Sequence, residues 1–73
     1  MSLRAEVKDI FITLASSDKY SHNWKAVYEN VPFLTMLRMV AEDMFINPHT
    51  YPAEMVYTIR RALKQLRDTG VLE

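Results

Sequence analysis

A mainly α-helical domain is the fold class that this sequence predicts. Apolar residues recur at intervals of three and four along most of the chain, which is the spacing of one helix face. The 73 residues include one glycine and three prolines, too few for the many tight turns of an all-β fold. A chain of this length forms one domain at most, so we expect a single domain over residues 1–73. Met1, Ser2 and Leu3 are typical of a leader from an expression vector, and Glu73 of the start of a tag.

The first two helices are expected over residues 4–16 and 22–30. The polar residues 16–18 between them interrupt the apolar pattern. Ser21 is the expected N-cap of the second helix. Pro32 sets the end of that helix, because the residue before a proline avoids the α region. The two apolar stripes consist of Val7, Ile10, Phe11 and Leu14, and of Trp24, Val27 and Tyr28.

The third helix is expected to begin with Pro32 in its first turn and to end near Phe45. Its apolar residues extend beyond a single stripe, which predicts that it is the central buried helix. Met36 and Met39 cannot share one face with all their apolar neighbours, so one of them is expected at the surface. The stripe consists of Phe33, Leu37, Val40 and Met44, and it is widened by Leu34, Met36 and Ala41.

A turn over residues 47–50 leads to the fourth helix, which begins at Pro52 and runs to about Thr69. Glu54 lies in its first turn, where a carboxylate favours the helix dipole. Gly70 fits the left-handed position that ends a helix, and residues 71–73 are expected to form a strand. The buried stripe of this helix is expected to contain Val56, Ile59, Leu63 and Leu66.

The end of this helix is the most specific pattern in the chain. An amphipathic helix stops at a glycine and is followed directly by the apolar Val71 and Leu72. This arrangement is typical of winged helix-turn-helix domains, in which the recognition helix leads into the wing hairpin. We therefore expect a winged helix-turn-helix-like bundle of three to four helices, with a short terminal strand that Val71 holds to the core. The wing itself is missing or truncated, and the opposite face of helix 52–69 is free for a partner.

That free face carries the candidate DNA-binding residues. Those in the N-terminal half of the helix are placed to contact base edges in the major groove, and the basic residues further along to hold phosphates. A face of mixed charge is also typical of ordinary solvated surface, and basic residues near a helix C-terminus complement the dipole without any ligand. Both interpretations therefore stay open. The candidates are Glu54, Tyr57, Thr58 and Arg61 for bases and Arg60, Lys64 and Arg67 for phosphates, with Gln65 and Asp68 on the same face.

Residues 58–73 resemble the C-terminal winged-helix domain of the Dam-replacing type of restriction endonuclease. That family's motif has the form I-R-x-x-L-x-x-L-R-D-x-x-hydrophobic-hydrophobic-E. In the family this domain binds methylated target DNA while a separate nuclease domain cuts, so the resemblance implies a regulator or the DNA-recognition domain of a larger restriction-type enzyme. This sequence departs from the family in a longer turn over residues 47–52 and in stopping before a wing hairpin. The matching residues are Ile59, Arg60, Leu63, Leu66, Arg67, Asp68, Val71, Leu72 and Glu73.

No catalytic or cofactor-binding pattern is found in the sequence. Without cysteine and with a single glycine, the chain cannot form thiolate metal sites, nucleophile elbows, phosphate-binding loops or dinucleotide-binding glycine clusters. His22 and His49 lack the spacing of metal ligands. Glu42 and Asp43 are adjacent, so their side chains diverge by about 100° on a helix and are expected at a solvated edge. We expect no enzyme activity, no cofactor, no metal and no small-molecule substrate.

Charge and hydropathy bound the partners and the location. Nine basic and nine acidic residues cancel, so DNA binding would depend on local clustering or on a larger protein. The neutral charge and the five methionines favour an alternative, a protein-interaction or dimerisation module of the same fold, with a homodimer through helix 33–44. No run of about 18 apolar residues could span a membrane, and no signal-peptide pattern is present. A cytoplasmic protein is therefore expected.

Overall fold

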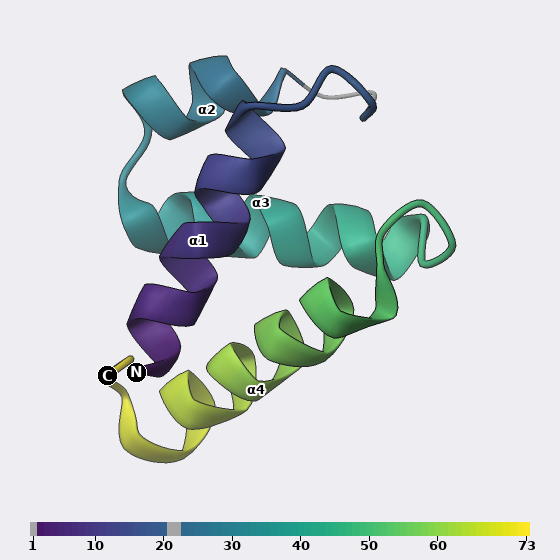
Figure 1. Ribbon diagram of the computed structural model, residues 1–73. Coiled ribbons are helices and arrows are strands. Elements are labelled where there is room, and N and C mark those ends of the chain that lie inside the picture. Colours follow the sequence, from purple (N-terminus) through teal and green to yellow (C-terminus); the bar gives the residue numbers. More distant parts are fainter. Residues whose placement is uncertain (1, 21–22) are drawn as a thin grey trace.

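Four helices make up the computed structural model, which describes residues 2–20 and 23–73 (Figure 1). They are α1 (Leu3–Ala15), α2 (Trp24–Asn30), α3 (Phe33–Ile46) and α4 (Ala53–Thr69). The prediction of a mainly α-helical domain is confirmed, and each predicted helix agrees with its observed bounds to within about two residues. The described residues contain no strand, so the predicted strand over residues 71–73 is not confirmed.

The helix α1 runs through the middle of the molecule (Figure 1). It contacts α2 near one end and α4 along the other. The helix α3 crosses α1 and contacts both α2 and α4. The tail that follows α4 ends beside the beginning of α1. This arrangement leaves α4 at one edge of the molecule, with its outer side open.

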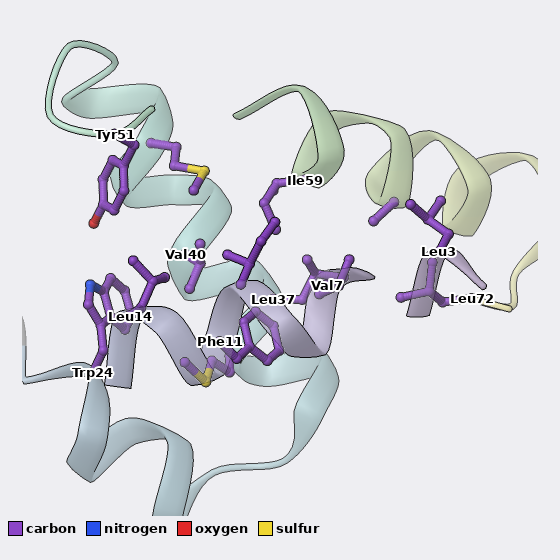
Figure 2. Close-up of a cluster of buried hydrophobic side chains, with 14 residues drawn as sticks. Leu3, Val7, Phe11, Leu14, Trp24, Leu37, Val40, Tyr51, Ile59 and Leu72 are labelled. Carbon is purple, nitrogen blue, oxygen red and sulfur yellow. The ribbon is translucent and has the colours of Figure 1, made fainter. Parts of the chain in front are cut away.

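The core lies where the apolar stripe of α1 meets the other helices (Figure 2). Val7, Phe11 and Leu14 of that stripe are at most 1% exposed. The ring of Phe11 packs on Phe33 of α3, with the ring centroids 5.0 Å apart. Because the stripe reaches all three of the other helices, α1 holds them together. Those helices contribute Trp24 from α2, Met36, Leu37, Val40 and Met44 from α3, and Ile59 and Ala62 from α4.

The helix α3 buries one face only, although the sequence predicted a central buried helix. Met36 and Met44 are 1% and 3% exposed, whereas Met39 is 37% and Phe45 85% exposed. One of the two methionines at positions 36 and 39 is thus at the surface, as predicted. A domain of this size has too few elements to cover a helix on all sides. The apolar residues of α3 outside its main stripe therefore reach the surface.

The buried face of α4 is rotated relative to the predicted stripe. Ile59 and Ala62 are 2% and 0% exposed, whereas Leu63, which was predicted in the stripe, is 37% exposed. Ala62 belongs to the buried core although its side chain is small. The neighbouring Leu63 is turned by about 100° from it and lies toward α3.

The starts of the helices agree with the predicted capping chemistry in part. Asn23 caps α2, because its side-chain oxygen accepts a hydrogen bond of 3.2 Å from the Ala26 amide. Ser21, which was predicted for this role, lies outside the described residues. Pro32 and Pro52 precede the first residues of α3 and α4, one position before the predicted one. A proline is tolerated there because the first amides of a helix have no partner within the helix.

Gly70 ends α4 as predicted. Its φ of 77° is left-handed, and its amide donates to the Leu66 carbonyl oxygen at 2.8 Å. The tail that follows turns back to α1, where the Arg4 amide donates to the Glu73 carbonyl oxygen at 2.9 Å. Leu72 is buried in the core at 5% exposure.

The tail is held by a different residue from the one predicted. Val71, which was expected to pack on the core, is 56% exposed, and Leu72 is buried in its place beside Leu3 (Figure 2). Successive side chains of an extended segment point to opposite sides, so only one of the two can face inward. The direction of the turn at Gly70 determines that Leu72 and not Val71 faces the core. This direction could not be predicted from the sequence.

A buried carboxylate fastens the turn between α3 and α4. Asp43 is 8% exposed and accepts hydrogen bonds from the Tyr51 hydroxyl and from Nδ2 of Asn47, the latter at 3.3 Å. Tyr20 stacks on the Tyr51 ring with centroids 4.7 Å apart, and the Tyr51 hydroxyl points toward the indole nitrogen of Trp24 (Figure 2). Burial raises the pKa of the Tyr51 phenol, and the hydrogen bond to Asp43 raises it further. The predicted solvated edge is therefore wrong for Asp43, because a tyrosine eight residues later covers it.

Replacing this tyrosine tests the carboxylate cluster. Tyr51→Phe is expected to lower the free energy of unfolding by about 1–3 kcal/mol, because a buried acceptor loses a hydrogen bond. The folded protein holds the Tyr51 proton more tightly than the unfolded chain does. The stabilisation is therefore complete below a pH of about 10 and is lost as the pH rises further. Urea denaturation across this pH range should show a steeper loss of stability in the original protein than in Tyr51→Phe, with the more exposed Tyr28→Phe as control. Parallel pH profiles would contradict the expectation.

A second substitution tests the turn at the end of α4. Gly70→Ala is expected to cost about 1 kcal/mol, because a side chain strains the left-handed conformation. No atom lies within 4 Å of the added Cβ, so the cost comes from the backbone and not from a clash. Gly70→Asn is the matched control, since asparagine tolerates this conformation. Urea denaturation should give a smaller loss for asparagine than for alanine, and equal losses would exclude the backbone explanation.

Candidate nucleic-acid interface

The helix α4 presents most of the predicted DNA-binding residues on its open side. Tyr57 is 65% exposed, and Glu54, Arg60, Arg61, Lys64 and Arg67 are exposed as well. Thr58 and Gln65 are half-buried. They are seven residues apart and so share one edge of the helix, the edge nearer to the tail and α1. The structure thus brings six of the eight candidates to one open surface and leaves two at its margin.

This surface is basic along the middle of α4. Between Glu54 and Asp68 the helix contains four basic residues and no acidic one. At the end of the row, Nε of Arg67 lies 3.3 Å from the carboxylate of Asp68, and an ion pair this exposed contributes little. The surface is therefore locally positive, although the charges of the whole chain cancel. The four basic residues are Arg60, Arg61, Lys64 and Arg67.

Arg61 leans toward α1. Its Nη1 lies 3.9 Å from Oε2 of Glu6, and its guanidinium carbon lies 5.6 Å from the centre of the Tyr57 ring. The two charged side chains are 46% and 37% exposed, so their attraction is worth at most about 1 kcal/mol. A stronger anion can displace Glu6 from the guanidinium at little cost. Tyr57 and Arg61, both predicted to contact bases, thus form one unit on the N-terminal half of α4.

Gln65 takes part in holding the tail, a role that the sequence did not indicate. Its side-chain oxygen accepts a hydrogen bond of 2.6 Å from the Glu73 amide. The Thr69 hydroxyl lies close by, 2.9 Å from the carbonyl oxygen of Val71. The amide group of Gln65 is therefore directed at the tail and away from the middle of the basic surface.

A hollow that was not predicted lies between α3 and α4. Its volume is about 130 Å³, and its lining is apolar apart from Arg60. Ala41 and Phe45 of α3 and Val56 and Leu63 of α4 are among the lining residues. Phe45 directly follows the last residue of the predicted α3 stripe, so its side chain is turned by about 100° from that stripe. That offset is the sequence feature that could have indicated its exposure.

Other kinds of site find little support in the described part of the chain. No cluster of three or more histidine, cysteine, aspartate or glutamate residues that could hold a metal ion occurs there. His49 is exposed in the turn before α4, and His22 lies outside the described residues. Glu42 is exposed, as predicted. None of the helices in residues 2–20 and 23–73 is both long enough and apolar enough to cross a membrane.

The role of Gln65 can be tested by truncation. Gln65→Ala is expected to reduce the free energy of unfolding by about 1 kcal/mol, the typical net contribution of one hydrogen bond. The adjacent substitution Lys64→Ala is the control. It should change the free energy of unfolding by no more than about 0.5 kcal/mol, because the Lys64 side chain is exposed. Urea denaturation measures both. Amide hydrogen exchange at Glu73 should become faster only in Gln65→Ala, and an unchanged rate would argue against the contact.

Comparisons with known proteins do not indicate a function for this chain, so the functional interpretation depends on the geometry of α4. No protein-family model matches the chain, and no similar curated protein or solved structure is found. The resemblance of residues 58–73 to the Dam-replacing type of restriction endonuclease stays a prediction.

Proposed function

We propose that this chain is a DNA-binding module of the winged helix-turn-helix type, in which α3 and α4 form the helix-turn-helix. The observation that carries the proposal is the outer surface of α4, with four exposed basic residues and no acidic residue between Glu54 and Asp68. A single helix with one open basic side fits the major groove of duplex DNA. The position of α4 at the edge of the molecule supports this use, because no other described element lies over its outer side (Figure 1).

Each residue of the surface has a distinct role in this proposal. Arg60, Lys64 and Arg67 bind phosphates and set the position of the helix on the duplex, without contributing sequence information. The N-terminal half of α4 carries the base contacts. Arg61 exchanges Glu6 for a guanine edge, and Tyr57 beside it contacts a base or sugar. Glu54 accepts from a cytosine amino group, and Thr58 contacts the margin of the groove.

The neutral charge of the chain limits how tightly the module binds on its own. Phosphate contacts supply most of the affinity of DNA-binding proteins, and on α4 four basic residues are grouped to provide them. We therefore propose a regulator or the recognition domain of a larger restriction-type enzyme, in line with the resemblance of residues 58–73. In that setting the remaining affinity comes from another domain or from a second DNA-binding module.

Salt-dependent binding tests this function. Fluorescence anisotropy with a labelled duplex should show binding by the full chain at low salt, with a slope of log K against log salt of roughly −2.7, as expected for three phosphate contacts. Lys64→Ala should weaken binding and reduce the slope by about 1.

Lys25→Ala is the matched control for Lys64→Ala, because it removes the same charge from α2, outside the proposed interface. It should leave both the affinity and the slope unchanged. Absence of duplex binding at low salt, or equal effects of the two lysine substitutions, would refute the proposed interface.

A further inference from the structure

We infer that the hollow between α3 and α4 is a docking site for a short acidic segment of a partner protein that carries one large apolar side chain. The hollow lies beside the proposed DNA surface and shares Arg60 with it, but its apolar lining is not used in DNA binding. The inference rests on three properties of the hollow: its size, the exposed apolar residues at its rim, and the sign of the charges around it.

The size of the hollow fits one apolar side chain. Its volume is about 130 Å³. An engineered apolar cavity of about 150 Å³ in another protein binds benzene, so a hollow of this size takes one phenylalanine ring or leucine side chain. Its walls come from both helices, with Ala41 on α3 and Val56 on α4, and its floor includes the buried Met44 and Ile59. It is thus a preformed pocket for a single anchor residue.

The rim of the hollow exposes apolar surface that a partner would cover. Phe45 is 85% exposed and Leu63 37% exposed, and both line the hollow. Single exposed apolar residues are common on protein surfaces, but apolar residues grouped around a hollow are typical of binding sites. Phe45 can pack on the backbone of an inserted segment, and Leu63 on its anchor side chain.

The charges around the hollow are basic. Arg60 lines it directly. Arg38 lies one turn before Ala41 on the same face of α3, and Arg67 lies one turn after Leu63 on α4. Neither Glu42 of α3 nor Asp68 of α4 lines the hollow. Glu42 lines a separate hollow beside Trp24, and Asp68 is paired with Arg67.

This charge pattern selects the occupant. A two-fold interface would bring the hollow against the same surface of a second copy, and the three arginines would face one another. Like charges at an interface suppress such pairing, so a homodimer through α3 is disfavoured. In an acidic segment with one apolar anchor residue, the acidic residues complement the arginines and the anchor side chain fills the hollow. Arg60 also belongs to the proposed DNA surface, so the acidic segment and duplex DNA would compete.

The test uses two short labelled peptides of aspartate and glutamate, one with a central phenylalanine and one with alanine in its place. Fluorescence anisotropy with the full chain should show that the phenylalanine peptide binds at least about tenfold more tightly. Phe45→Ser should weaken binding of the phenylalanine peptide alone, and its exposed position keeps the fold intact, which circular dichroism verifies. Arg61→Ala should leave peptide binding unchanged, because Arg61 lies on the side of α4 toward α1. Equal affinity for the two peptides would overturn the inference, since charge alone would then explain binding.

Two further measurements separate this inference from the proposed function. Phe45→Ser should leave duplex DNA binding unchanged, and unlabelled duplex should displace the phenylalanine peptide. DNA binding without peptide binding would refute the docking site alone, and peptide binding without DNA binding would refute the DNA-binding function alone. Sedimentation equilibrium tests whether a second copy of the chain occupies the hollow instead. If the protein forms a dimer and Phe45→Ser makes it monomeric, the hollow is a dimer interface and the inference is overturned.

Discussion

The apolar stripe of α1 is the contact on which the rest of the fold depends. It meets Trp24 of α2 and Phe33 of α3, and its first turn holds the tail through Leu3 and Leu72. The helix α2 has seven residues, too few to be stable in isolation, so it forms because it packs against this stripe. The direction in which α4 turns its basic side is set by the same packing. The candidate interface near the end of the chain is therefore positioned by residues near its beginning.

The positions of the helices could be predicted because spacing and capping are local properties of the chain. The covered side of each helix could not, because it depends on which elements lie nearby. Ala62 contributes little to a pattern of large apolar residues, yet it is fully buried in the core, and Leu63 beside it is exposed. Residues 71–73 have the composition of a strand, but a strand needs an extended neighbour, and the element beside them is a helix.

The part of the candidate site that could be predicted is its charge, because the positions of basic residues can be read from the sequence. The row of basic residues on α4 and its open side were predicted together, whereas their individual contacts were not. Arg61 meets Glu6 of another helix, and Gln65 bonds to the tail, so both depend on tertiary structure. The hollow at Phe45 needs two helices to form it, and no pattern within one helix reveals it.

The backbone hydrogen bond between Arg4 and Glu73 brings the two ends of the chain to the same corner of the molecule (Figure 1). A domain whose ends meet can be inserted into a loop of a host protein without forcing that loop apart. The same geometry suits circular permutation, because a short linker could join the ends and new ends could open in an exposed turn. Anything attached to this chain, at whichever end, would start beside the last turn of α4. A fused domain would then stand next to the phosphate-binding end of the proposed interface and leave its base-contacting end clear.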